Sequence, residues 1–241
     1  MATPERLRLV THSFDQLTAF ERRIVKEVHR MNIIIFGAAG GIGRHAVKHA
    51  LAKGYQVTAY LRDKNKLNIS DKNLRIVEGE ISDYTSVLKA LEGHDAVIWC
   101  VGIPLKRKYE KMQSLEGHQV LVRAMKEAGV KRLVDWGTPS VPFEKDKKSF
   151  ITVVPGIMAG IALTMAKKEM VEIGKLIQAS DLDWTLVRFM APKDTPYTGN
   201  VKIGFGDVKM SFAISREDIG AFMVEQVDSK QYLNSMPIIG S

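Results

Sequence analysis

The stretch Met31-Asn-Ile-Ile-Ile-Phe36, followed by Gly37-Ala-Ala-Gly40-Gly-Ile-Gly43, decides the fold of this 241-residue chain. Its first part is a short apolar, β-branched run that ends at a glycine, which is typical of a buried parallel strand. Its second part leads into apolar residues at helical spacing that stop at Gly54. The glycines therefore occupy a strand-to-helix turn, where free backbone N–H groups and the helix dipole favour a pyrophosphate.

Glycine triplets of this kind also occur by chance, so the flanking elements carry the argument. A strand before the turn, a helix after it and a second strand downstream favour a dinucleotide site. The alternative is a turn that only packs the helix on the sheet. The residues expected to cradle the pyrophosphate are Gly37, Ala39, Gly40, Gly41, Ile42 and Gly43.

The next part of the chain alternates between strand and helix patterns. Strands are predicted at residues 56–62, 74–77, 95–101, 131–136 and 182–188, and helices at 85–91, 115–128 and 166–179. Such alternation requires right-handed crossovers and a parallel sheet that is covered on both faces. The sequence therefore predicts an α/β fold with a Rossmann-like, doubly wound parallel sheet.

The C-terminal part departs from this rhythm and predicts a small substrate lobe. Residues 207–212 alternate like a half-exposed strand, Ser215 caps a helix that runs to about Val227, and residues 237–239 form a last edge strand. Together with the segments 139–165 and 189–212, these pieces would form the rim of a substrate cleft beyond the carboxyl ends of the strands. The NAD(P)-binding domain is predicted to span residues 31–241.

Composition limits the classes of function. The net charge of +8 is not accompanied by a basic helix or an aromatic-plus-basic strand, so we expect no nucleic-acid partner. We interpret no apolar run as a membrane span and expect no membrane partner. The single cysteine, Cys100, excludes an internal disulfide and suits a reducing cytoplasm. No histidine has the spacing from acids or cysteine that indicates a metal site.

Residues 1–30 stand apart from this domain. Phe14, Leu17 and Ile24 recur at roughly helical spacing, and the acidic residues among them are unlike those of a transit peptide. We interpret residues 1–30 as an appended N-terminal amphipathic helix, or as an upstream extension of the reading frame, with no role in the chemistry.

The end of the second strand indicates which nucleotide is bound. An acid at this place binds the ribose hydroxyls of NAD, whereas an arginine pairs with the 2′-phosphate of NADP. Arg62 ends the predicted strand, whereas Asp63 lies beyond it and would only orient Arg62. NADP (as NADPH) is favoured; NAD, or an ordinary exposed Arg-Asp pair, is the alternative.

Two further segments are expected at the cofactor. Glu80 and Ile81 follow the third strand and are placed to flank the adenine. Cys100, Val101 and Gly102 end the fourth strand, where the backbone is expected to pass close to the cofactor. For the side chain of Cys100, a core position is expected.

With these residues the chain resembles an atypical short-chain dehydrogenase/reductase, of the NAD(P)-binding (NmrA-like) group that includes flavin and biliverdin-IXβ reductase-like proteins. The resemblance covers residues 31–241. The motifs that carry it are the glycine turn, Tyr60-Leu-Arg62-Asp, Glu78-Gly-Glu-Ile-Ser-Asp83, Ala128-Gly-Val-Lys-Arg132, Ala179-Ser-Asp-Leu-Asp-Trp184-Thr-Leu-Val-Arg188 and Ile214-Ser-Arg-Glu-Asp218. It implies a Rossmann domain with a small variable lobe and a reduction that uses NADPH.

The chain departs from the family pattern at the catalytic positions. Ordinary members carry a serine and a Tyr-x-x-x-Lys set, in which the tyrosine is a general acid. Here the serine's place is Trp136-Gly-Thr138, and the tyrosine's place is Thr164, with Lys168 at the matching spacing. A threonine hydroxyl is too weak an acid to replace a phenol. Thr138 and Lys168 remain as candidates to contact the substrate, the nicotinamide or its ribose, with a turn cap and a solvated lysine as the alternatives.

The remaining chemistry is hydride transfer to an acceptor that needs little acid help, such as a flavin, a quinone or a tetrapyrrole. A small, planar, apolar substrate would be held mainly by proximity and orientation. Candidate lining residues, each equally well explained as core, are Trp136, Phe143, Phe150, Met158, Met165, Met190 and Tyr197. The alternative function is a non-catalytic NADP-binding redox sensor that acts through a protein partner, and a homodimer also stays open. Epimerase or dehydratase chemistry on a nucleotide sugar would need the missing tyrosine.

Overall fold

The computed structural model describes residues 30–104 and 106–241, and residues Asn32–Ser241 form one compact unit. The predicted N-terminal extension, residues 1–30, lies outside the described residues except for its last position.

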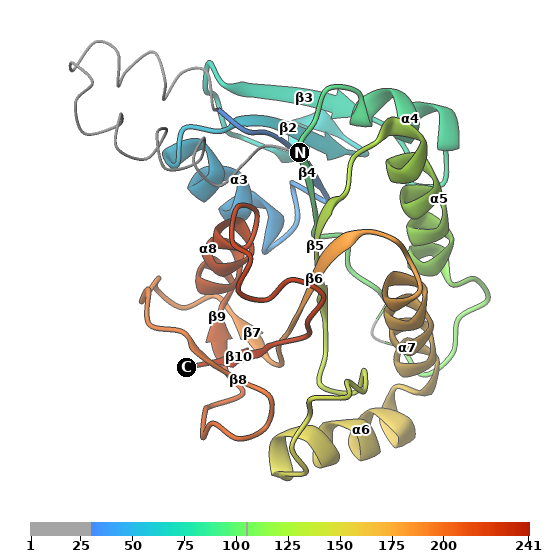
Figure 1. Ribbon diagram of the computed structural model, residues 1–241, viewed down its shortest axis with the longest axis vertical. Helices are drawn as coiled ribbons and strands as arrows, with labels where there is room; N and C mark the ends of the chain where they lie inside the picture. Colours follow the sequence, from blue (N-terminus) through green and yellow to red (C-terminus); the bar gives the residue numbers. More distant parts are fainter. Residues whose placement is uncertain (1–29, 105) are drawn as a thin grey trace, which may run out of the picture. The chain divides into compact units, whose positions relative to one another are not determined.

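An eight-stranded sheet runs through this unit in the order β3-β2-β1-β4-β5-β6-β10-β8 (Figure 1). Its strands are β1 (Asn32–Phe36), β2 (Gln56–Leu61), β3 (Leu74–Glu78), β4 (Ala96–Trp99), β5 (Arg132–Gly137), β6 (Asp183–Arg188), β8 (Lys202–Gly204) and β10 (Ile238–Gly240). Every pairing in it is parallel except that of β10 with β8. The carboxyl ends of β1 to β6 therefore meet at one edge, as the predicted doubly wound sheet requires.

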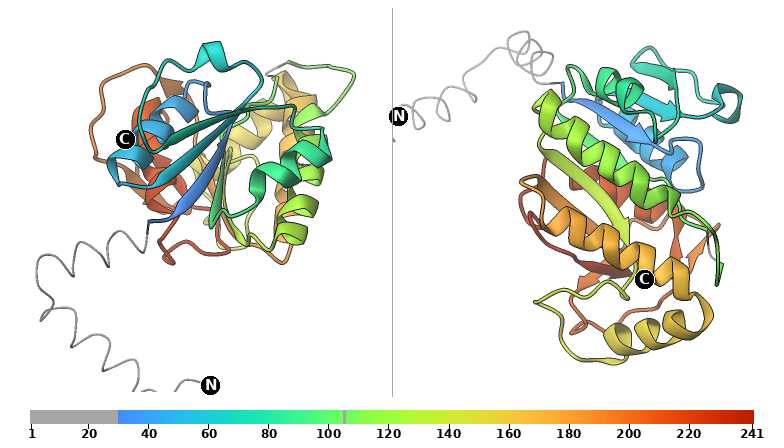
Figure 2. Two further views of the ribbon diagram at one scale, coloured as in Figure 1. Left: turned by 90° about the horizontal axis from the view of Figure 1, so that it is seen from above. Right: turned by 90° about the vertical axis from the view of Figure 1, so that its right-hand side faces the viewer.

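Helices cover both faces of the sheet, as Figure 2 shows from two further directions. The helices are α3 (Gly43–Ala52), α4 (Tyr84–Leu91), α5 (Gln113–Ala128), α6 (Phe150–Ala162), α7 (Thr164–Gln178) and α8 (Arg216–Glu225). On one face α3 packs against α8, and on the other α4 and α7 flank α5. The main apolar core lies on the α4-α5-α7 side, where Phe36 stacks on Trp99 and contacts Tyr60.

The strand expected at residues 207–212 is wrong. The backbone bends there because Gly206 has a φ of +99° and the Asp207 carboxylate accepts a hydrogen bond from the Phe205 N–H at 2.8 Å. The strand of this region lies earlier, at β8. Residues 237–239 do contribute to a strand, but β10 is not at the edge, because β8 pairs along its other side.

The segment 139–165 contains a helix that the sequence patterns did not predict. Helix α6 (Phe150–Ala162) carries Pro155, Gly156 and Gly160, which are poor helix formers. Its apolar residues nevertheless recur at helical spacing. At its amino end the Thr152 hydroxyl donates to the Lys147 carbonyl at 2.7 Å.

A buried arginine ties the loop after β5 to the sheet. Arg188, at the end of β6, is fully buried and forms a two-pronged ion pair with Asp146 at 2.5 and 2.8 Å. It also donates to the carbonyl oxygens of Val141 and Met236. These bonds fix the path of residues 141–146 beyond the carboxyl end of the sheet, because an unpaired buried guanidinium would be costly.

The small lobe is anchored in a similar way. Strands β7 (Pro192–Lys193) and β9 (Ile214–Ser215) form a separate parallel pair. The Ser215 hydroxyl caps α8 by accepting from the Glu217 N–H, as predicted. Buried Asp218 accepts hydrogen bonds from the N–H groups of Thr198 and Gly199 and from the Thr198 hydroxyl, which holds the crossing loop against α8.

We expect Tyr60 to make the unit sensitive to alkali. Burial, and then the charges of Asp83 and Glu80, raise the pKa of Tyr60 from 10.0 to about 12. The stability that its neutral phenol provides is complete below pH 10 and is lost as the pH rises through 12. Between pH 10 and 12 the free energy of unfolding of Tyr60→Phe should fall less than that of the wild type, by up to about 2 kcal/mol. Urea titrations at a series of pH values measure this difference. Parallel curves for the two proteins would contradict this.

Candidate nucleotide-binding site

The glycine turn lies between β1, β4 and α3, where side chains would not fit. Gly37 has a φ of +72°, and a Cβ on it would stand 2.7 Å from the backbone of Cys100 and Val101. A Cβ on Gly43 would stand 2.2 Å from the Gly37 carbonyl oxygen, and one on Gly40 would stand 3.1 Å from the same atom. The turn is therefore a bare backbone cradle, which fits the close approach of a phosphate.

The start of α3 carries the positive end of the helix dipole. No side chain caps it, and its first turn contains no acid. Ala39, Gly41 and Ile42 lie in the turn just before it and are only partly buried or exposed. Free N–H groups and the helix dipole make such an end favourable for an anion.

Arg216, which sequence reasoning did not select, lies beside this turn. Its Cδ and Nε are 2.9 and 3.0 Å from the place that a Cβ on Gly41 would take. Asp194 pairs with Arg216 at 2.8 Å and with Arg44 at 3.8 Å. The packing of α8 against α3 brings the Arg216 guanidinium to the glycine turn. The two segments are far apart in the sequence, so no local pattern could have predicted this contact.

Arg62 follows the last residue of β2 directly and is exposed. Within residues 30–104 and 106–241 it has no hydrogen bond or ion pair. The neighbouring Asp63 does not orient it, contrary to our expectation. Asp63 instead caps the short 3-10 turn Lys64–Lys66 by accepting from the Asn65 N–H at 3.1 Å. Arg62 is thus available to pair with the 2′-phosphate of NADP, whereas the Asp63 carboxylate, which would bind the ribose hydroxyls of NAD, is already engaged by Asn65.

The segment after β3 lies along the next part of this edge. The Tyr60 hydroxyl donates to the Glu80 carbonyl at 3.1 Å, and the Glu80 side chain is exposed. Ile81 is half-buried against Gly117 of α5. Both residues therefore follow β3 where the sequence placed them, with Ile81 turned toward the core.

The fourth strand was predicted to run to Val101, whereas β4 ends at Trp99, so Cys100, Val101 and Gly102 follow the strand instead of ending it. The Cys100 N–H donates to the Phe36 carbonyl at 2.8 Å, so this backbone stays beside the glycine turn. Burial, and then the charge of Asp135, raise the pKa of the Cys100 thiol well above its usual range. The thiol is therefore protonated and unsuited to nucleophilic chemistry.

Two aromatic rings, Trp136 and Phe189, and two hydroxyl groups lie at the carboxyl ends of β5 and β6. The Trp136 indole N–H donates to the Val101 carbonyl at 2.9 Å, and its ring stacks on Phe189 at 5.6 Å between centroids. The hydroxyl groups of Thr138 and Ser140 are 2.6 Å apart. Ser140 is a second hydroxyl that sequence reasoning missed.

The start of α7 carries the other expected position. The Thr164 hydroxyl donates to the Gly160 carbonyl at 3.0 Å. Lys168 is exposed, and in the described part of the chain no hydrogen bond or ion pair engages it. The next residue, fully buried Glu169, accepts from the Leu115 N–H at 3.0 Å and from the Tyr109 hydroxyl at 2.5 Å. Among the described residues, no hydrogen bond joins Lys168 to Thr138.

The candidate lining residues do not form one group. Trp136 lies beside Val101, whereas Phe143 packs against Trp184 and Phe205. Phe150 is exposed on α6. Tyr197 contacts His49 of α3, whereas none of the other candidates makes a ring contact with α3 among the described residues. Met165 and Met190 are half-buried, and the Met158 side chain lies outside the described set.

A buried His-Asp pair lies behind Cys100. His118 of α5 and Asp135 of β5 are almost completely buried, with 2.9 Å between Nε2 and Oδ2. His118 Nδ1 is 2.6 Å from the Ser114 carbonyl oxygen, and Asp135 Oδ1 accepts from the Trp136 N–H at 2.7 Å. Both ring nitrogens of His118 therefore lie beside oxygen atoms, so the buried pair is fully engaged in hydrogen bonds.

Other features of the described residues lie away from this edge. A cavity of about 430 Å³ lies between the carboxyl-terminal ends of α5 and α7, and one of about 300 Å³ lies at the amino ends of β1 to β3. Among residues 30–104 and 106–241, no three His, Cys, Asp or Glu side chains are grouped to hold a metal ion. Each helix described is too short or too polar to traverse a bilayer.

Comparison with known proteins places this chain. The family model described as NAD(P)H-binding matches residues 37–230, from the first turn glycine to beyond α8. The chain belongs to the NAD(P)H-binding family. A phenylcoumaran benzylic ether reductase from Pinus taeda is 28% identical over 229 residues, covering 85% of this chain and 67% of that protein. An isoflavone reductase homolog from Arabidopsis thaliana is 25% identical, covering 86% and 68%.

Solved structures of similar fold agree with this assignment. An anaerobilin reductase from Escherichia coli O157:H7 is 18% identical, with a TM-score of 0.69 over 87% of this chain and 97% of that one. A short-chain dehydrogenase/reductase from Veillonella parvula, solved with NADP, is 15% identical, with a TM-score of 0.68 over 88% and 94%. The Rossmann-like fold is confirmed, the family model confirms the expected NAD(P)H-binding family, and the expected NAD(P)H-dependent oxidoreductase class agrees with the reductase relatives.

For this member of the NAD(P)H-binding family, we expect the two substitutions of Asp135 to differ sharply. In Asp135→Asn, the amide oxygen can still accept from the Trp136 N–H, and the amide N–H₂ can donate to His118 Nε2, so stability should change by less than about 1 kcal/mol. Asp135→Leu leaves buried polar groups unpaired and should cost about 3 kcal/mol. Urea unfolding measures both, and equal losses would contradict the assigned bonding.

Proposed function

We propose that this chain is an NADPH-dependent reductase that transfers a hydride to a flat, largely apolar acceptor of the flavin, quinone or tetrapyrrole kind. The observation that carries the proposal is the pairing of a bare glycine cradle with free Arg62 at the end of β2. The first would hold the pyrophosphate, and the second would pair with the 2′-phosphate. The reductase names of the curated relatives support the direction of the reaction.

The bound nicotinamide would supply the hydride. The cradle of Gly37, Gly40 and Gly43 would position the cofactor, and Arg216 would add a second cation at the pyrophosphate. The hydroxyl pair of Thr138 and Ser140 offers hydrogen bonds at the end of β5. The half-buried face of Trp136 suits a planar acceptor.

The protein offers little acid catalysis at this place. The Thr164 hydroxyl is a weak acid and is engaged with the Gly160 carbonyl. The proton that accompanies the hydride would therefore come from water, and the rate would depend on proximity and orientation. This favours acceptors that are reduced readily over simple ketones, which need a phenol in this family.

We expect two arginines to have separable effects on nucleotide binding by calorimetry. Arg62→Ala should weaken NADPH about tenfold or more and leave NADH unchanged, because only NADPH carries the 2′-phosphate. Arg216→Ala should weaken both nucleotides, because both carry the pyrophosphate. Arg75→Ala, a matched change at an exposed arginine of β3, is the control. Equal affinity of the wild type for NADPH and NADH would refute the assignment of Arg62.

Turnover decides between catalysis and sensing. NADPH oxidation at saturating FMN, a soluble quinone or biliverdin should be measurable with the wild type. Thr138→Val and Lys168→Gln should each lower kcat about tenfold if these side chains contact the cofactor or acceptor, whereas Lys48→Gln on exposed α3 should not. Tight NADPH binding without turnover of any of these acceptors would instead favour the redox-sensor function.

A further inference from the structure

The outer face of α6 is an unusual surface for this unit. Six large hydrophobic side chains are exposed among the described residues, and four of them lie on α6. They are Phe150, Val153, Ile157 and Ile161, which are 67%, 46%, 58% and 71% exposed. Spacings of three, four and four residues place them on one stripe of the helix. A stripe of this kind marks a contact with another apolar phase.

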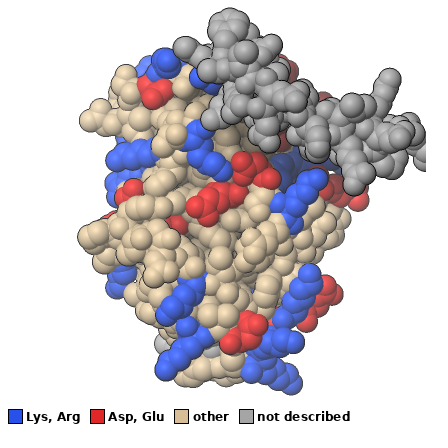
Figure 3. Space-filling model, turned by 60° about the vertical axis from the view of Figure 1, so that its left-hand side comes forward, with Lys and Arg blue, Asp and Glu red and all other residues tan. Residues whose placement is uncertain are grey.

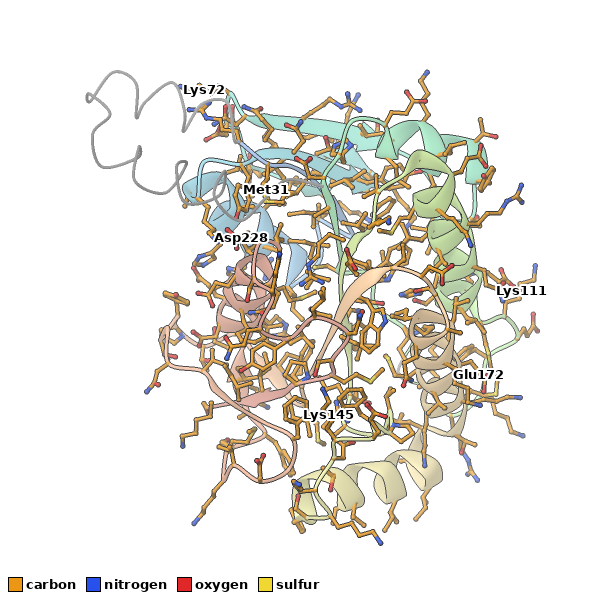
Figure 4. The ribbon with its side chains drawn as sticks, viewed as in Figure 1. Met31, Lys72, Lys111, Lys145, Glu172 and Asp228 are labelled. Atoms are coloured by element: carbon orange, nitrogen blue, oxygen red, sulfur yellow. The ribbon has the colours of Figure 1, made fainter. Side chains whose placement is uncertain are left out.

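Basic residues border both ends of this stripe. Lys145, Lys147 and Lys148 precede α6, and Lys167 and Lys168 follow it closely in α7. The Met165 N–H donates to the Arg107 carbonyl at 3.3 Å, which brings the basic run of residues 106–108 to the start of α7. Figure 4 shows Lys145 near α6, at the opposite end of the unit from Lys72.

Few acids oppose these cations. The uncharged stretch between the lysine pairs, residues 149–166, contains no Asp or Glu. Asp146 is committed to Arg188, buried Glu169 accepts from Tyr109 and Leu115, and Glu172 pairs with Lys175. The exposed acids near the basic segments in sequence or contact are Glu110, Glu144 and Asp207. On the face drawn in Figure 3, blue side chains surround the lower end of the unit, with acidic groups between them.

From this we propose that α6 docks the protein onto an anionic membrane surface, with its apolar stripe in the lipid and the flanking lysines at the head groups. Aliphatic insertion and attraction of lysines to anionic lipid are the two terms that hold such helices at an interface. The stretch does not span the bilayer, because it is divided between α6 and α7 at Leu163. This departs from the expectation of no membrane partner, which considered spanning segments only.

The chemistry of the stripe favours lipid over protein occupants. A second copy of this chain would bring the same lysines against each other in a two-fold contact, which like charges oppose. The stripe is a convex helix face of one aromatic and three aliphatic side chains. It offers no hydrogen-bonding group to select a protein partner, whereas a bilayer requires none.

Vesicle sedimentation with the full chain, without nucleotide, tests the proposal independently of catalysis. The wild type should bind phosphatidylcholine vesicles that contain phosphatidylserine, bind weakly to phosphatidylcholine alone, and release at high salt. Ile157→Asp/Ile161→Asp should reduce binding about tenfold or more through lost insertion. Lys147→Glu/Lys148→Glu should do so through lost attraction.

Matched variants elsewhere serve as controls. Ile76→Asp changes an exposed aliphatic residue of β3. Lys66→Glu/Lys72→Glu changes two exposed lysines, of which Lys72 lies at the opposite end of the unit in Figure 4 and Lys66 lies in the 3-10 turn that contacts β3. Both should bind vesicles like the wild type, and all variants should keep the wild-type circular dichroism and NADPH affinity. Absence of wild-type binding to the anionic vesicles, or equal binding by all variants, would overturn the proposal. So would a concentration-dependent dimer that Ile157→Asp/Ile161→Asp abolishes in place of vesicle binding.

Discussion

The close backbone contact between β1 and β4 at Gly37 is the constraint on which the site depends. Gly37 lies so near the backbone of Cys100 and Val101 that a Cβ would stand 2.7 Å away, and Gly43 lies equally tightly over the Gly37 carbonyl. These contacts seat the first turn of α3 directly at the strand ends. Gly220 of α8 approaches α3 in a similar way, because a Cβ on Gly220 would stand 2.9 Å from the backbone nitrogen of Ala46. The missing side chain lets α8 lie against α3. Arg216 reaches the turn as a result.

Sequence patterns predicted the elements whose burial is uniform. Strands β1, β2, β4, β5 and β6 are mostly buried, whereas the edge strand β3 is largely exposed and was predicted from its place in the strand-helix alternation. Helix α5 ends at a recognisable signal, Gly129 with a φ of +73°. Glycines with a strand before and a helix after them identified the cradle, because that chemistry is local in the chain. The place of Arg62 directly after β2 was predicted by the same logic, since it is defined by the end of one strand, and its role at the cofactor stays a prediction.

The features that were missed depend on contacts between distant residues. The bend at Asp207 depends on the packing of its turn against Lys147, which is distant in the chain. The packing is so close that a Cβ on Gly206 would lie 2.6 Å from the Lys147 carbonyl oxygen. The His118–Asp135 pair joins a helix and a strand that carry no common motif. Helix α6 was not predicted, because Pro155 and its glycines disfavour a helix, although its apolar residues do recur at helical spacing. The low helix propensity of these residues was therefore a poor guide at α6, since an amphipathic pattern can outweigh propensity.

The placement of α6 links the lipid surface to the chemistry proposed for the edge of the sheet. The chain leaves β5 at Thr138, is fixed by the Arg188–Asp146 ion pair, forms α6 and returns in α7 with Lys168 in its first turns. Any shift of α6 at a membrane therefore acts on the two segments that carry the candidate contacts to the acceptor. An apolar acceptor partitions into the same phase as Ile157 and Ile161. A reductase without a phenolic acid gains most from a high local concentration of its acceptor, because proximity is what the protein supplies.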